Sequence, residues 1–239
     1  AKNLQPASFI RLGDGEGCFL LRSASLKPGV REYTVDFIES AWFGQRIPDW
    51  QAKNIYDILV NAIANSDYLG IPTQARIRYE LANDARGAIG CLNALLSSST
   101  ARGKRCSASA NDFLEIQENV YSLFSCLPYL GTISPHRDLG ASLRAKLDIE
   151  MGDDIIIPPQ QDSGISNQSQ GDTHLGMFKE ICERIRQVAG PGRIFVVAGG
   201  LLGKCYIEAI RSSGGVAIDI GAVADLWCGY KTRGHHHLV

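Results

Sequence analysis

The chain has 239 residues, which is long enough for one large α/β domain or two small ones with a sizeable buried core. Its 24 basic and 25 acidic residues nearly cancel, so no broad positive field for nucleic acid or anionic membranes is implied. No apolar run approaches the roughly 20 residues that a membrane span needs. We therefore expect neither a nucleic-acid partner nor a transmembrane segment.

The seven cysteines are scattered along the chain and form no C-x-x-C pair. This pattern predicts reduced, structural thiols and argues against a disulfide framework or a zinc site. The first residues also lack the charged start and apolar centre of a signal peptide. The sequence therefore predicts a cytoplasmic location.

The first predicted element is a short buried strand over residues 9–12, which stops at the glycine-rich segment 13–17. Its glycines predict a sharp turn that brings the backbone close to another group. Asp14 and Glu16 stand two positions apart, so in an extended or bent segment both carboxylates point to one side. Two such carboxylates repel unless a cation lies between them, and Mg²⁺ or Mn²⁺ suits their oxygens. The alternative is a solvated turn after a strand.

The middle of the chain alternates between helical and extended patterns. Apolar residues at helical spacing predict helices over about 50–65, 110–125, 139–147 and 174–189, and a polar helix is predicted over about 76–97. Short apolar runs that end at turn residues predict strands over about 66–72, 129–134 and 154–157. The Ser/Arg-rich segment 97–105 and the polar segment 160–173 are predicted loops, and the second is long enough to act as a lid.

The last third gives the clearest pattern. A near-continuous apolar run over 193–198 predicts a buried parallel strand, followed by a glycine turn, a helix over about 202–212 and a second buried strand over 216–221. This is the strand–helix–strand unit of a nucleotide-binding sheet. We therefore predict an α/β, Rossmann-like fold with a mostly parallel sheet flanked by helices. We predict a single domain over 1–239, with a flexible tail at 234–239.

The glycine turn is a candidate anion site. The predicted helix begins at three glycines, Gly199, Gly200 and Gly203. Its first N–H groups and the positive end of its dipole favour a phosphate, and Lys204 stands in its first turn. The alternative for these glycines is tight packing of the helix on the sheet. Asp219 ends the next strand, about 20 residues on, where the equivalent acid of a dinucleotide site holds the ribose. The alternative for Asp219 is a cap at the strand end.

His136 follows the end of the predicted strand 129–134. A histidine there is a candidate donor to a phosphate or a sugar, and it neutralises negative charge when protonated. The alternative is a structural histidine. Trp227 stands beside charged residues near the C-terminus, and its ring suits either a sugar face or the core.

Several segments of the chain, taken in order, resemble the GT-D-type glycosyltransferases of bacterial glycan assembly. These segments are 11–16, 67–71, 133–136, 197–204 and 217–229, with Thr232-Arg233. The resemblance runs from residue 9 to about 233, and segment 73–128 carries none of its motifs. It implies a Rossmann-like domain that transfers a sugar from a nucleotide-sugar donor, most commonly a uridine diphosphate sugar. It further implies that the Asp-x-Glu motif, Asp14 and Glu16, engages a divalent metal.

These observations together predict a metal-dependent glycosyltransferase of the hexosyltransferase type. Its partners would be a nucleotide sugar and a glycan or glycoconjugate acceptor, and the oligomeric state stays open. The predicted catalytic residues are Asp14, Glu16 and His136, and the predicted cofactor-binding residues are Arg11, Gly13, Gly199, Gly200, Gly203, Lys204 and Asp219. One alternative is a non-catalytic nucleotide or dinucleotide binder that uses 199–203 and Asp219. A further alternative is a metal-dependent phosphohydrolase.

Overall fold

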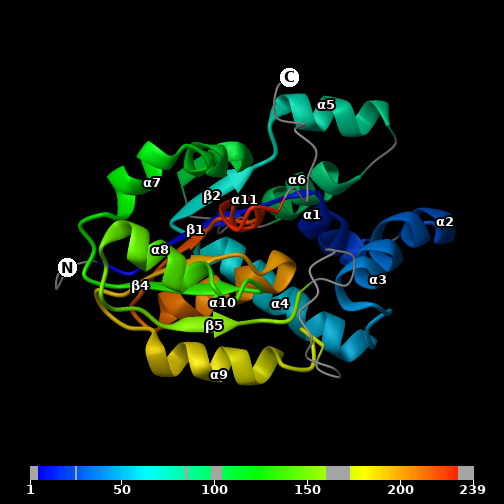
Figure 1. The fold of residues 1–239 in the computed structure, drawn as a ribbon. Helices are drawn as coiled ribbons and strands as arrows, with labels where there is room; N and C mark the ends of the chain where they lie inside the picture. The colour runs from blue at the N-terminus through cyan, green and yellow to red at the C-terminus, as the bar shows by residue number, and fades with distance from the viewer. Residues whose placement is uncertain (1–4, 25, 84–85, 98–103, 160–172, 231–239) are drawn as a thin grey trace. The chain divides into compact units, whose positions relative to one another are not determined.

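The computed structural model describes residues 5–24, 26–83, 86–97, 104–159 and 173–230 (Figure 1). It contains a seven-stranded sheet in the order β3-β2-β1-β7-β6-β4-β5. The strands are β1 (Ala7–Arg11), β2 (Tyr68–Ile71), β3 (Lys104–Ser107), β4 (Leu130–Ser134), β5 (Asp154–Ile156), β6 (Ile194–Val197) and β7 (Val216–Asp219). All pairs with an assigned register are parallel. The predicted α/β class, with a parallel sheet flanked by helices, is confirmed.

The helices cover more of the chain than the sequence predicts. The first half holds α1 (Asp14–Leu20), α2 (Pro28–Arg31), α3 (Phe37–Phe43), α4 (Asp49–Asn65), α5 (Gln74–Ala82) and α6 (Gly87–Ser97). The second half holds α7 (Gln117–Phe124), α8 (Leu139–Leu147), α9 (Phe178–Val188), α10 (Gly200–Ser212) and α11 (Val223–Trp227). Shorter helical turns are η1 (Leu21–Ser23), the π-helical η2 (Glu32–Asp36) and the 3₁₀-helical η3 (Ala108–Glu115).

Most of the predicted elements are confirmed, and three predictions are wrong in detail. The predicted helix over 76–97 is two helices, α5 and α6. The predicted helix over 110–125 divides into η3 and α7, and the predicted loop 97–105 ends in β3. The side chains of β3 are mostly exposed, so this strand lacks the apolar pattern that reveals the others. The predicted loop 160–173 lies, apart from its last residue, outside the described residues, as does the predicted flexible tail.

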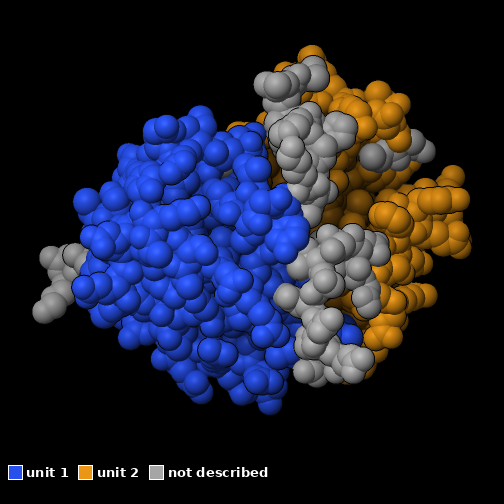
Figure 2. Space-filling model, viewed as in Figure 1, with its two compact units in different colours: residues 1–9, 110–159, 163–239 blue, residues 10–109, 160–162 orange. Residues whose placement is uncertain are grey.

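Contacts between Cα atoms divide the chain into two compact units, coloured in Figure 2. Unit 1 comprises the described parts of 1–9, 110–159 and 163–239, and unit 2 comprises the described parts of 10–109. A compact unit defined by contacts is not by itself a domain that folds alone. The single domain therefore stays a prediction.

Unit 1 has a helix layer on each face of its strands. Leu139, Leu143 and Leu147 of α8 pack in one core cluster with residues of α7, α11 and β6. α9 contacts β5, α10 contacts β6 and β7, and these two helices also pack against each other. Figure 1 shows α8 and α9 on opposite sides of β5. This is the arrangement that right-handed crossovers between parallel strands produce.

The strand order of unit 1 contains a topological switch point between β4 and β6. These two strands are neighbours, but the chain leaves β4 toward β5 on one side and leaves β6 toward β7 on the other. In open α/β sheets, ligands bind in the crevice outside the carboxyl ends of such strands. Here the loops at that crevice begin at Pro135 and Ala198. The topology therefore directs attention to the residues just after β4 and β6.

Two expectations from composition can be compared with the fold. All seven cysteines are free thiols, as predicted. Within the described residues, no helix combines the length and the apolar character that a membrane span requires. The cytoplasmic location stays a prediction.

Candidate active site

Helix α1 in unit 2 starts directly at Asp14, where the sequence predicts a turn. Gly13 is its N-cap residue, with an extended backbone, and Glu16 is already in the first helical turn. Residues two positions apart in an α-helix lie about 200° apart around its axis. The expectation that both carboxylates point to one side of an extended segment is therefore wrong.

Glu16 turns back toward the start of its own helix. Its Oε2 accepts a hydrogen bond of 2.9 Å from the backbone N–H of Gly13, and the residue is buried. This contact satisfies a backbone donor at the helix start and places a negative charge at the positive end of the helix dipole. In this arrangement Glu16 stabilises the start of α1.

Asp14 is accessible to solvent. Its side chain is 57% exposed, and its Oδ2 lies 2.9 Å from an Nη2 nitrogen of Arg76. The Nε of Arg76 donates to the buried Glu80 at 2.7 Å, so the guanidinium is held between two carboxylates. Burial, followed by the charges of Asp14 and Glu80, raises the pKa of the Cys18 thiol to about 12. Negative charge therefore collects around the first turn of α1.

The predicted metal can be tested against these side chains. Asp14 offers the hard, half-exposed carboxylate that suits Mg²⁺ or Mn²⁺, and Mg²⁺ often takes only one or two protein carboxylates. The Oε2 of the buried Glu16 accepts the backbone N–H of Gly13, so Glu16 is less accessible to a cation than Asp14, and its role as a metal ligand stays a prediction. Within the described residues, no group of three or more His, Cys, Asp or Glu side chains is arranged to hold a metal ion. The Asp14 side chain is suited to be a metal ligand, and the metal itself stays a prediction.

The glycines of α1 meet other protein groups. A Cβ on Gly17 would lie 1.6 Å from the carbonyl oxygen of Gly87, and a Cβ on Gly90 would lie 2.0 Å from the carbonyl oxygen of Gly17. A Cβ on Gly15 would lie 2.4 Å from the ring of Trp42. The close approach predicted from these glycines is thus an approach of α1 to α6 and Trp42. Arg11, a predicted cofactor contact, donates a hydrogen bond of 3.0 Å to the carbonyl of Ala108.

The predicted glycine turn of unit 1 opens helix α10 as expected. Gly199 is the N-cap residue, and Gly200 has a left-handed backbone with φ of 53°. A Cβ on Gly199 would lie 2.9 Å from the Cα of Gly203, so this position allows no side chain. The turn places the start of α10 at the carboxyl end of β6, where the helix dipole presents positive potential.

Lys204 and Asp219 bind each other. The Lys204 Nζ lies 2.8 Å from an Asp219 carboxylate oxygen, and their side chains are 5% and 3% exposed. This ion pair links α10 to the end of β7. The proposed contacts of Lys204 with phosphate and of Asp219 with ribose stay predictions, and in this structure both groups are buried and paired.

His136 lies at the switch point, just after β4. Its Nε2 is 2.7 Å from Asp225, and the ring of Tyr230 stacks on it with centroids 5.2 Å apart. The hydrogen bond with Asp225, and then one with Cys228, raises the pKa of His136 to about 9. The raised pKa favours the cationic form of His136 at neutral pH, which suits charge neutralisation better than general-base catalysis. The sequence did not indicate that Asp225 is its partner.

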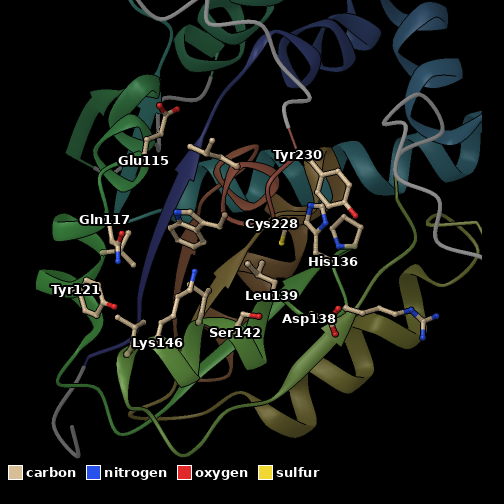
Figure 3. Close-up of a pocket in the computed structure, with 17 residues that line it drawn as sticks. Glu115, Gln117, Tyr121, His136, Asp138, Leu139, Ser142, Lys146, Cys228 and Tyr230 are labelled. Atoms are coloured by element: carbon tan, nitrogen blue, oxygen red, sulfur yellow. The ribbon is translucent and has the colours of Figure 1, made fainter.

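A cavity of about 700 Å³ extends from His136 along α8 (Figure 3). Its lining comes from three separate segments, 115–121, 135–147 and 226–230. In Figure 3 the side chains of Lys146, Leu139 and Tyr121 come from two helices, α8 and α7, that flank the cavity. Of these residues the sequence analysis singled out only His136 and Trp227, because no local pattern shows that the three segments meet.

Comparisons with known proteins agree with the fold. No protein-family model matches the sequence, and no curated protein sequence is significantly similar to it. A solved structure described as a new glycosyltransferase (DUF1792) from Streptococcus sanguinis has a TM-score of 0.56 at 15% identity, covering 94% of this chain and 80% of that chain. A second, described as domain of unknown function 1792 with a distinct glycosyltransferase fold, has a TM-score of 0.57 at 16% identity, covering 94% and 76%.

A third solved structure, of selenomethionine-substituted domain of unknown function 1792, has a TM-score of 0.57 at 14% identity, with 94% and 76% coverage. At such identities the likeness shows the fold alone. The chain therefore has the distinct glycosyltransferase fold described for those proteins, and the resemblance found in the sequence is confirmed at that level.

Proposed function

We propose that this protein is a metal-dependent glycosyltransferase of the hexosyltransferase type. Its donor would be a nucleoside-diphosphate sugar, and the first candidates are uridine diphosphate sugars. Its acceptor would be a glycan or glycoconjugate of bacterial polysaccharide biosynthesis. The observation that carries the proposal is the hydrogen-bonded pair of His136 and Asp225 at the β4/β6 switch point of a glycosyltransferase fold. This is the crevice where open α/β sheets bind anionic ligands.

The reaction exchanges one bond for another. An acceptor hydroxyl oxygen bonds to the anomeric carbon of the donor, and the bond from that carbon to the diphosphate oxygen breaks. The nucleoside diphosphate leaves with the electron pair, and the hydroxyl proton passes to the buffer. Negative charge grows on the leaving diphosphate, so groups that present fixed positive charge accelerate the step.

In unit 1 two groups present positive charge at the crevice. The hydrogen bond of 2.7 Å with Asp225 raises the pKa of His136, which favours the protonated ring, and the Asp225 carboxylate shares its positive charge. The N-terminus of α10 follows the neighbouring strand β6 and contributes the positive end of a 13-residue helix. Both are fixed by the fold before any ligand arrives, which is the condition for electrostatic stabilisation without reorganisation.

In unit 2, Asp14 is the residue that would hold the divalent cation. A bound Mg²⁺ or Mn²⁺ stabilises the negative charge of a leaving nucleoside diphosphate. Arg76 contacts the same carboxylate from a position fixed by the buried Glu80. Asp14 would therefore exchange or share its arginine partner when the cation binds. Glu16 keeps the first turn of α1, and with it Asp14, in position.

The test is a thermal-shift series of nucleotides and nucleotide sugars, each with and without Mn²⁺. Ligand at a hundredfold excess over Kd stabilises the native state by about 2.7 kcal/mol, which raises the Tm of a chain of this size by roughly 5 °C or more. We expect a Mn²⁺-dependent shift with one nucleoside diphosphate and its sugars, which Asp14→Asn removes. Transfer to an acceptor is then measured with that donor.

Two outcomes would overturn the proposal. A shift with NAD alone, indifferent to metal, would identify a dinucleotide binder. Release of inorganic phosphate from the nucleotide without transfer to any acceptor would identify a phosphohydrolase.

A further inference from the structure

The cavity beside α8 is lined by His136 and by parts of unit 1 that have no assigned role. We call it the α8 groove and define it by Glu115, Tyr121, His136, Ser142, Lys146 and Trp227. Its volume of about 700 Å³ lies in the range of small-molecule sites, roughly 300–1,000 Å³. One end opens at His136 beside the β4/β6 switch point, and the groove follows α8 to its last turn.

Three aromatic rings line the groove. The indole of Trp227 is fixed, because its Nε1 donates a hydrogen bond of 3.0 Å to the carbonyl of Leu114. Tyr230 stacks on His136 and is still 49% exposed, and Tyr121 on α7 is 37% exposed. Rigid, partly exposed rings with an apolar body and a polar edge suit a ligand that has both apolar faces and polar groups.

The polar side chains of the groove are available to a ligand. Within the part of the chain that the structure describes, the side chains of Glu115, Gln117, Ser142 and Lys146 form no hydrogen bond or ion pair, and all four are exposed. They supply acceptors, donors and groups that are both, rather than a single sign of charge. Such a mixture favours a neutral ligand with many hydroxyls over a phosphate or a purely apolar ligand.

We propose that the α8 groove binds the sugar acceptor of the transfer reaction, with a pyranose ring against its aromatic side chains and the hydroxyls on Glu115, Ser142 and Lys146. A sugar combines apolar C–H faces with a rim of hydroxyls, which matches both sets of lining groups. The end at His136 directs the bound acceptor toward the switch point. The inference rests on the proposed transferase function, and it names the acceptor subsite of that function.

The binding test follows the indole N–H signals by NMR in protein labelled with ¹⁵N-tryptophan. The chain has three tryptophans: Trp227 lines the groove, whereas Trp42 and Trp50 belong to unit 2. Each signal is assigned with the corresponding Trp→Phe variant. The probes are the methyl glycosides of glucose, galactose and N-acetylglucosamine. We expect at least one probe to move the Trp227 signal saturably while the other two signals stay in place.

The kinetic test uses variants on the groove and matched variants away from it. Tyr121→Ala and Lys146→Ala are each expected to raise the acceptor KM about fivefold or more, with kcat and nucleotide-induced stabilisation unchanged. Tyr33→Ala and Lys179→Ala are the controls, since these side chains are exposed (86% for the Tyr33 residue, 91% for the Lys179 side chain) and do not line the groove. Both controls are expected to keep the wild-type acceptor KM.

The outcomes separate this inference from the proposed function. Transfer activity with normal acceptor KM in both groove variants, and a Trp227 signal indifferent to every glycoside, would overturn the groove assignment and leave the transferase standing. A Trp227 signal that moves with uridine diphosphate instead of the glycosides would overturn it too, in favour of a nucleotide site. Glycoside binding at Trp227 without any nucleotide binding would support the sugar site while the transferase proposal failed.

Discussion

Two glycine-rich segments of this chain look alike in sequence and differ in the structure. Segment 13–17 follows β1 and opens α1 in unit 2, and segment 199–203 follows β6 and opens α10 in unit 1. At α1 the glycines allow the helix α6 to pack closely against α1, and the carboxylate of Asp14 is half-exposed. At α10, Gly199 packs against the Cα of Gly203 in the same helix turn, and the nearest charges, Lys204 and Asp219, are buried together.

The difference teaches what a glycine after a buried strand does and does not indicate. At Gly15, Gly17 and Gly199 it marks a place where another group comes too close for a side chain, whereas Gly203 has only an ordinary contact. Whether that group is a ligand or a neighbouring helix depends on what packs there, which the glycines do not encode. The accessible charge is the better guide to a ligand, and it lies on Asp14, whereas His136 and Lys204 are both buried and paired with a carboxylate.

The largest expected change in stability comes from the difference in burial between the Lys204–Asp219 and Asp14–Arg76 ion pairs. Lys204→Ala leaves the Asp219 carboxylate buried without its cation, and breaking a buried pair costs about 3–5 kcal/mol. The matched variant Asp14→Asn breaks a half-exposed pair and is expected to cost at most about 1 kcal/mol. Urea unfolding of both variants measures the difference. Equal losses would mean that the two ion pairs do not differ in burial.

The contrast in glycine packing gives the next effect. In Gly17→Ala the new methyl meets the carbonyl of Gly87, a backbone atom that cannot rotate away, so we expect a loss of about 3 kcal/mol. In Gly203→Ala the nearest atom is a methyl of Val197 at 3.5 Å, an ordinary contact. This variant is expected to be neutral or to gain up to about 1 kcal/mol from helix propensity. A stable Gly17→Ala protein would contradict the α1–α6 packing.

The pH dependence of stability tests the charges in unit 1. The pKa of His136 rises from 6.5 to about 9, so its contribution is complete below pH 6.5 and is lost as the pH rises through 9. Burial lowers the pKa of His174 from 6.5 to about 4, so stability is also lost as the pH falls from 6.5 toward 4. Each shift corresponds to at most about 3 kcal/mol. Unfolding experiments from pH 4 to 9.5 measure the free energy of unfolding as a function of pH. We expect His136→Gln to remove the loss of stability at alkaline pH and to leave the loss at acidic pH unchanged. An unchanged loss at alkaline pH would contradict the His136–Asp225 pair.

Substitution of the two acidic residues of α1 gives the smallest expected change in stability, but the two variants are expected to differ in their response to Mn²⁺ with nucleotide. Glu16→Gln keeps an acceptor for Gly13 but removes the charge at the helix start, which costs about 0.5–1 kcal/mol. The thermal shift caused by Mn²⁺ with nucleotide is expected to persist in Glu16→Gln and to disappear in Asp14→Asn. The opposite pattern, with the shift lost in Glu16→Gln and kept in Asp14→Asn, would make Glu16 the ligand.

The sequence predicted the strands that are buried and missed the features that depend on packing. β6 and β7 are apolar runs, which is how buried parallel strands read, whereas β3 exposes most of its side chains and shows no such run. The helix at Asp14 was missed because its glycines have poor helix propensity, which contact with α6 outweighs. The α8 groove was missed because its walls come from segments far apart in the chain.

The crossing of α1 and α6 has a consequence for how this chain has evolved. Positions 17, 87 and 90 restrict one another, since a side chain at any of them collides with the backbone of the opposite helix. Because these contacts are with backbone atoms, no substitution at the opposite position relieves them, and we expect all three positions to stay glycine in homologues with the same helix crossing. A profile weighted on these three positions should recover distant homologues that whole-length alignment overlooks.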